Sequence, residues 1–149
     1  MSSFVPSHTD AVPVWDQTMK VLFCVLLLVL ASSKSNAQQY DYLVSMQPAL
    51  TNSVVTIKGS KTPLLYYSCY NPSGLDAFVQ LFDAVSASAV RLGTTMPKRV
   101  LTAPGLSDTG PQQPTPPLSF SLGMQVAATS TSNGPAAPSS PISCEFGYR

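Results

Sequence analysis

The stretch Ile142-Ser-Cys-Glu-Phe-Gly-Tyr-Arg149 decides the fold class, because its apolar and polar residues alternate one by one. A period of two is typical of a β-strand that buries one face and exposes the other. The same alternation runs through residues 118–122, where serines separate the apolar side chains. We therefore expect strands at both places, with Cys144 on the buried face of the last one.

Other strand signals precede these two segments. Residues 54–57 and 64–70 are β-branched or aromatic runs bounded by glycine, proline or asparagine, which are turn residues. Residues 40–46 predict a weaker first strand. Residues 124–128 continue or follow the strand at 118–122, with a bend or bulge near Gly123.

Two structures fit residues 75–92. Ser73 and Asp76 have the spacing that begins a helix, and the apolar residues that follow have helical spacing: Leu75, Phe78, Val79, Phe82, Val85, Ala89 and Leu92. Residues 77–83 also fit a strand that follows a turn at 71–74. The neighbouring aromatic strand favours the second structure, in which 77–83 pairs with 64–70 as a hairpin.

Two segments have the composition of long loops. Residues 103–117 contain five prolines, and proline is excluded from the centre of a sheet. Residues 129–141 are rich in serine, threonine, proline and glycine and have no periodicity. Loops of this length are either mobile or carry a binding surface.

The N-terminal part of the sequence predicts an export signal. Lys20 precedes eleven apolar residues at 21–31, too few for a helix that crosses a bilayer core of ~30 Å. The run matches the apolar region of a secretory signal peptide, and Ser35 and Ala37 are the small residues expected before a cleavage site. We expect cleavage after Ala37 and a secreted or periplasmic product.

This assignment divides the chain into an N-terminal extension with signal peptide, 1–37, and a single domain, 38–149. Residues 1–18 contain Asp10 and Asp16 but no lysine or arginine, unlike the usual basic leader. Both Met1 and Met19 are therefore candidate start sites, and Met19-Lys20 makes the more compact leader.

Two cysteines remain after cleavage, Cys69 and Cys144. An even number of cysteines in a small exported domain predicts a disulfide, since the compartment is oxidising. Two buried free thiols are the alternative. We expect the disulfide.

The composition excludes several classes of function. Only 10% of the 149 residues are charged and the net charge is +1, without the basic clusters that nucleic-acid binding requires. The single histidine, His8, lies before the cleavage site, so the mature chain lacks the residue that Ser-His-Asp and Cys-His catalysis and most zinc sites need. Asp76 and Asp83 are the nearest pair of carboxylates, and we expect them to be turn and strand-end residues. We predict a non-catalytic protein without metal or cofactor.

Besides the two long loops, an aromatic sheet face formed by tyrosines is a candidate interaction surface. Tyr66, Tyr67 and Tyr70 lie within seven residues of one another, and Tyr40 and Tyr42 lie upstream. They could stack on a sugar, or they could pack in the core and across strands as tyrosines in strands ordinarily do.

The domain resembles a loose group of small β-rich proteins encoded by tailed bacteriophages and prophages. The resemblance covers about residues 63–149 and rests on Leu65-Tyr-Tyr-Ser-Cys-Tyr-Asn71, Phe78-Val-Gln-Leu-Phe-Asp-Ala84, a short Pro-bounded strand at 97–101, a segment at 118–131 and the closing Tyr148-Arg149. It implies a compact antiparallel β-sandwich with a structural or interactive role on or near a virion. It also implies a strand at 77–83.

Together these features predict an all-β protein, a jelly-roll-like antiparallel sandwich of about six to eight short strands. The expected function is that of a non-catalytic structural or recognition module of phage or prophage type, in the virion or exported. A secreted or periplasmic binding module for carbohydrate or a cell-surface partner is the alternative. We expect a protein partner or self-association, no nucleic acid and no stable membrane span.

Overall fold

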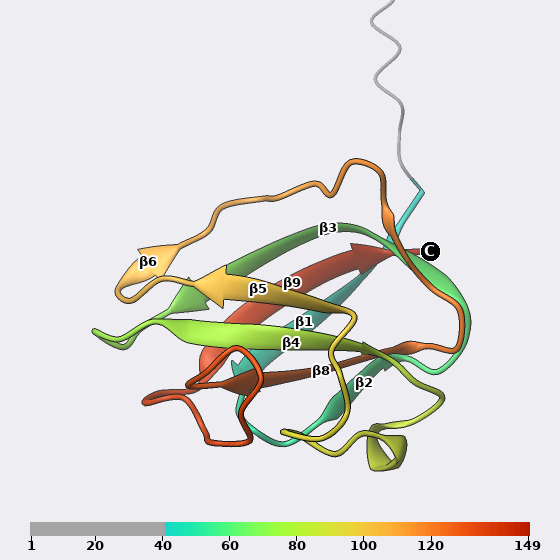
Figure 1. The fold of residues 1–149 in the computed structure, drawn as a ribbon. Helices are drawn as coiled ribbons and strands as arrows, with labels where there is room; N and C mark the ends of the chain where they lie inside the picture. The colour runs from blue at the N-terminus through green and yellow to red at the C-terminus, as the bar shows by residue number, and fades with distance from the viewer. Residues whose placement is uncertain (1–40) are drawn as a thin grey trace, which may run out of the picture. The chain divides into compact units, whose positions relative to one another are not determined.

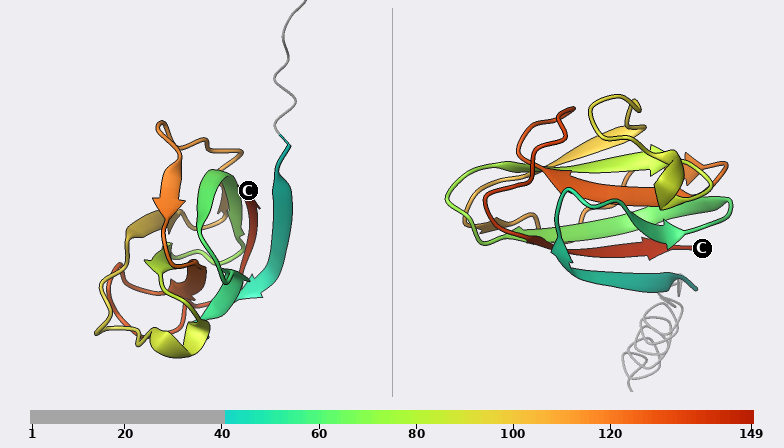
Figure 2. Two further views of the ribbon diagram at one scale, coloured as in Figure 1. Left: turned by 90° about the vertical axis from the view of Figure 1, so that its right-hand side faces the viewer. Right: turned by 90° about the horizontal axis from the view of Figure 1, so that it is seen from below.

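In the computed structural model, which describes residues 41–149, two antiparallel sheets pack face to face (Figures 1 and 2). Sheet A contains β1 (Leu43–Leu50), β9 (Ile142–Tyr148), β3 (Thr62–Asn71), β6 (Ser107–Asp108) and β7 (Leu118–Phe120). Sheet B contains β2 (Val55–Lys58), β8 (Met124–Thr129), β4 (Ala77–Asp83) and β5 (Arg99–Ala103). A single 3₁₀ turn, η1 (Ala87–Ala89), is the only helical segment in this part of the chain.

The strand order confirms the predicted sandwich and its jelly-roll character. Sheet A runs β1-β9-β3-β6 and sheet B runs β2-β8-β4-β5, so that most successive strands alternate between the sheets. Residues 41–149 form nine strands, one more than the largest number expected, because β6 arises inside the predicted loop 103–117. β6 and β7 both pair with the same edge of β3, β7 near its start and β6 near its end. The two short strands therefore occupy the same place in the strand order of sheet A.

The alternation in the sequence determines which side chains reach the core. Ile142, Cys144 and Phe146 of β9 are buried between the sheets, whereas the residues between them face outward. Leu81 and Val126 of sheet B meet them from the opposite layer. Each fully buried side chain of this size stabilises the fold by about 1.5–3 kcal/mol relative to its exposed state.

Residues 77–83 form a strand, but the predicted hairpin with 64–70 is wrong. β3 pairs with β9, and β4 pairs with β8 and β5. The chain crosses between the sheets at a turn built by the buried Asn71. Its Nδ2 donates to the carbonyl oxygens of Ala103 (2.8 Å) and Leu75 (2.9 Å), and its Oδ1 accepts from the backbone N–H of Ser73 (3.0 Å). These contacts turn the chain out of sheet A, so that β4 begins in the other layer.

The predicted bend near Gly123 is a second crossing between the sheets. Gly123 lies between β7 of sheet A and β8 of sheet B, with φ +153°, a conformation essentially restricted to glycine. A Cβ atom here would lie 2.7 Å from the carbonyl oxygen of Lys58 and 2.8 Å from that of Ala84. The crossing therefore requires glycine for its backbone conformation and for space.

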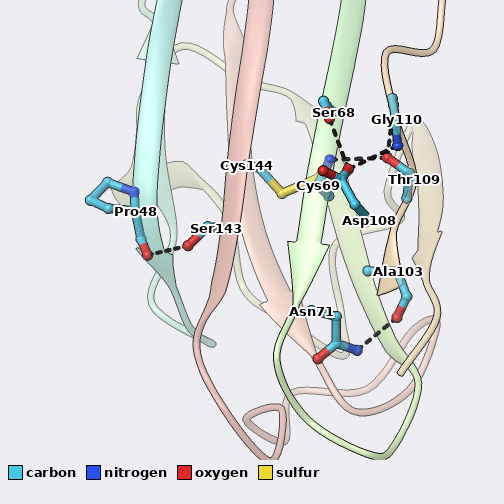
Figure 3. The surroundings of a disulfide bond; sticks show 10 residues. All are labelled: Pro48, Ser68, Cys69, Asn71, Ala103, Asp108, Thr109, Gly110, Ser143 and Cys144. Atoms are coloured by element: carbon cyan, nitrogen blue, oxygen red, sulfur yellow. Dashed lines mark hydrogen bonds between the residues drawn. A yellow bond between two sulfur atoms is a disulfide. The ribbon is translucent and has the colours of Figure 1, made fainter. Parts of the chain in front are cut away.

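The structure confirms the disulfide between Cys69 and Cys144 (Figure 3). The two residues lie directly opposite each other on β3 and β9, with Cα atoms 4.1 Å apart. Both are buried, and their sequence separation is 75. The bond therefore joins the middle of the chain to its C-terminal strand inside sheet A.

Both long loops make specific contacts. In loop 103–117, Gln112 and Tyr67 exchange two backbone hydrogen bonds of 2.8 and 2.9 Å, which extends the edge of sheet A along β3. Loop 129–141 is held by Gln80, whose Nε2 donates to the Thr129 hydroxyl (2.7 Å) and the Gly134 carbonyl (3.0 Å). In Figure 1 the first loop passes from β6 across β3.

The two sheets differ in how their outer faces are covered. All six residues of β8 are buried, because loop 129–141 and the segment after β4 lie over sheet B. Phe82, Ala84 and Val90 form a small apolar cluster there. The outer face of sheet A has no such cover over β1, where Val44 and Met46 are exposed. An open face of this kind is where a β-sandwich can contact a ligand or partner.

The predicted signal segment, 1–37, lies outside the described residues. Within 41–149, no helix has the length and apolar character that crossing a membrane would require.

Candidate functional site

A groove of about 660 Å³ runs between the outer face of sheet A and loop 103–117. Its floor comes from sheet A, with Tyr66 and Ser68 of β3 beside Glu145 of β9. Tyr42, just before β1, lies at one side, and the prolines of the loop form the opposite wall: Pro111, Pro114 and Pro117. Four segments that are far apart in the sequence thus line one concave surface, which is typical of ligand sites.

The ring of Tyr66 is positioned by a glycine on the neighbouring strand. Tyr66 and Gly147 lie opposite each other on β3 and β9, and a Cβ atom on Gly147 would overlap the Tyr66 ring. The glycine therefore lets the ring lie against the sheet, as aromatic residues do over cross-strand glycines. The ring of Tyr42 meets that of Tyr66 at a centroid distance of 5.2 Å and an interplanar angle of 74°. The two rings form adjacent, nearly perpendicular walls.

Glu145 is fixed in the groove by Tyr66. The Tyr66 hydroxyl donates a hydrogen bond to Oε1 of Glu145. Partial burial, this hydrogen bond and the nearby carboxylate charge raise the pKa of Tyr66 well above its ordinary value. The hydroxyl consequently keeps its proton and remains a donor throughout the physiological pH range.

A second carboxylate, Asp108, lies at the other end of the groove. Its Oδ1 accepts hydrogen bonds from the Ser68 hydroxyl (3.1 Å) and the backbone N–H of Gly110 (2.8 Å), as Figure 3 shows. Loop 103–117 is thereby joined to β3 at the edge of the groove. No sequence pattern points to Asp108, whereas the alternation at 142–149 predicts that Glu145 faces outward.

The structure separates the three predicted surface tyrosines. Tyr66 lies in the groove. Tyr70 also faces outward and is 48% exposed, but it does not line the groove. Tyr67 points inward and packs against the core. The aromatic ring that contacts Tyr66 is that of Tyr42, and not that of Tyr67 or Tyr70 as the sequence suggests.

Asp76 and Asp83, the carboxylates considered for catalysis, have structural contacts. Asp76 accepts a hydrogen bond from the backbone N–H of Gly105 (3.0 Å). Asp83 accepts bonds from the backbone N–H groups of Ser121 (3.0 Å) and Leu122 (2.7 Å), and forms an ion pair with Lys98 (2.9 Å). Burial alone would raise the pKa of Asp83, but these donors together outweigh it and hold the pKa well below the usual range. Both residues act as turn and strand-end residues, as expected.

The groove has the chemistry of a binding site. It offers two aromatic rings, a serine hydroxyl and two carboxylates. Among residues 41–149, no group of three His, Cys, Asp or Glu side chains is arranged to hold a metal ion. These residues can stack on a ligand, donate hydrogen bonds to it and accept hydrogen bonds from it.

No family model, curated protein or solved structure matches this chain.

Proposed function

We propose that the mature chain is a non-catalytic recognition module that binds a carbohydrate of a cell surface through the groove on sheet A. One observation carries the proposal: the rings of Tyr42 and Tyr66 and the polar groups of Ser68, Asp108 and Glu145 line the same hollow. This hollow lies on the outer face of sheet A, between the sheet and loop 103–117.

The proposal follows from what a sugar presents to a protein. A pyranose ring has an apolar face of C–H groups, which packs on an aromatic ring, and a rim of hydroxyls that need hydrogen-bond partners. Tyr66 and Tyr42 supply the rings, and the carboxylates accept bonds from the hydroxyls. Jelly-roll folds serve in lectins and in viral capsids alike, so the groove and not the fold favours sugar binding.

The virion-associated role implied by the phage resemblance remains a prediction. It shares its mechanism with the proposal, because both roles depend on surface contacts and require no reaction. A module that attaches a particle to a cell-surface glycan would combine the two.

Alanine at Tyr66 or Tyr42 is expected to weaken sugar binding about tenfold or more, because each substitution removes an aromatic contact in the groove. The measurement is titration calorimetry of the parent and the variants against the oligosaccharide that the parent binds best in a glycan panel. Tyr70→Ala is the matched control, since Tyr70 is on the same strand and exposed but lies outside the groove. Thermal unfolding checks that each variant is folded.

A parent that binds no glycan in the panel would contradict the proposal. Equal losses in Tyr70→Ala and Tyr66→Ala would contradict the assignment of the groove.

We also propose export with cleavage after Ala37, which the disulfide between Cys69 and Cys144 supports because such bonds persist in oxidising compartments. The intact mass of the exported protein should equal that of a chain that starts at Gln38, less two hydrogens. Reduction should restore the two hydrogens. A mass that retains residues 19–37 with free thiols would contradict both the cleavage and the secreted location.

A further inference from the structure

The two carboxylates of the groove are only partly used within the protein. One oxygen of Glu145 accepts a hydrogen bond from the Tyr66 hydroxyl. One oxygen of Asp108 accepts hydrogen bonds from the Ser68 hydroxyl and the backbone N–H of Gly110. Among the described residues, no donor reaches the second oxygen of either group. The occupied oxygens hold the carboxylates in place, and the others remain available to a ligand.

The charge of these carboxylates is not balanced inside the groove. No lysine or arginine is among the residues that line it in the described part of the chain. The ion pair of Lys98 lies elsewhere, with Asp83. Because a concave surface concentrates the field of its charges, the groove attracts cations and repels carboxylates and phosphates.

The aromatic walls favour the same kind of ligand. An ammonium group over the face of a tyrosine ring is attracted by the negative potential of that face. Tyr42 and Tyr66 present two nearly perpendicular rings to the groove, and Tyr66 is hydrogen-bonded to Glu145. An ammonium group in this corner would contact ring faces and a carboxylate together.

We propose that the groove selects a sugar with a protonated amino group, such as an oligomer of unacetylated amino sugars, over neutral and acidic sugars. This inference rests on the proposed carbohydrate binding and adds the chemical class of the sugar. The sugar ring would lie on one tyrosine, and its ammonium group would bind the free oxygen of Glu145 or Asp108.

The test compares a cationic, a neutral and an acidic oligosaccharide. Binding of a β-1,4-linked glucosamine oligomer is measured by calorimetry against its N-acetylated counterpart of equal length and an oligogalacturonate, at a pH where the amine is protonated. We expect the glucosamine oligomer to bind at least about tenfold more tightly than the acetylated one, and the acidic oligomer to bind most weakly. Higher salt should reduce the preference.

Variants locate the effect. Glu145→Gln and Asp108→Asn keep an oxygen that accepts the existing hydrogen bonds but remove the charge, so each should reduce the preference for the amino sugar several-fold. Asp76→Asn is the matched control, because Asp76 is an exposed carboxylate outside the groove. A preference that survives both groove variants would overturn the inference.

The remaining outcomes separate this inference from the proposed function. Equal binding of the amino and acetylated oligomers would overturn the inference and leave carbohydrate binding intact. Failure of every sugar to bind would overturn both. Displacement of the glucosamine oligomer by an equally charged lysine peptide at the same concentration would show that charge alone is recognised, and would overturn the choice of a sugar.

Discussion

Cys144→Ser is expected to lower the free energy of unfolding by about 4 kcal/mol. In the chain-entropy model, a bond that closes a loop of 75 residues restricts the unfolded chain by roughly this amount. For a domain of this size the loss corresponds to a fall in melting temperature of roughly 15–30 °C. Thermal and urea unfolding of the oxidised parent and the variant measure it.

Reduction supplies the control for this prediction. Reductant should lower the stability of the parent close to that of Cys144→Ser and leave the variant unchanged, because the variant has no bond to lose. Equal stability of parent and variant under oxidising conditions would show that the bond does not form in the protein.

Asp83→Asn is expected to destabilise the fold by about 2–3 kcal/mol. The carboxylate of Asp83 accepts bonds from the backbone N–H groups of Ser121 and Leu122 and from Lys98, and its side chain is only 17% exposed. Hydrogen bonds to a charged group contribute about 1.5–3 kcal/mol. An asparagine side chain has only one oxygen that can accept hydrogen bonds. Its NH₂ group would face some of the donors that now bind the second carboxylate oxygen. Urea unfolding at neutral pH measures the difference, with Asp76→Asn as the control for a carboxylate that accepts a single bond.

The contribution of Asp83 should also depend on pH. Because folding lowers the pKa of this carboxyl group, the stabilisation is complete above the unfolded value of about 3.9 and is lost as the pH falls through the folded value. The gap in stability between the parent and Asp83→Asn should therefore be constant near neutral pH and narrow below about pH 4. A gap that stays constant into strong acid would contradict the role of the charge.

The position of Glu145 illustrates how much local pattern can predict. The period of two at 142–149 is a property of the extended backbone, so it predicts a strand, an inward Cys144 and an outward Glu145 without any knowledge of neighbours. Residues 77–83 do not alternate in this way and also fit a helix, so their pattern alone leaves two structures open. Local pattern cannot predict that β4 pairs with β8 and β5, because any strand can pair with any other and the buried turn at Asn71 selects the sheet.

The groove depends on contacts that no local pattern contains. Tyr42, Tyr66 and Glu145 meet because β1, β9 and β3 are neighbours in sheet A, and Asp108 joins them because loop 103–117 pairs along β3. The prolines of this loop exclude a strand in the centre of a sheet, but they do not predict that the loop pairs with the edge of β3. The composition therefore predicts a mobile or ligand-binding loop, and the structure shows a loop that is anchored to β3 and forms a wall of the groove.

By itself, the sequence determined most of the strands, the all-β class and the cysteine pair, since these follow from residue type and spacing. Residues 77–83 also fit a helix, and β6 lies in a segment with the composition of a loop. Only the tertiary structure decided which tyrosine faces the groove. A shift of register between Leu64 and Tyr66 breaks the alternation of β3, so Tyr66 faces outward and Tyr67 faces the core. A one-residue shift exchanges the two faces of a strand. It arises from pairing with β9, whose Gly147 leaves room for the Tyr66 ring.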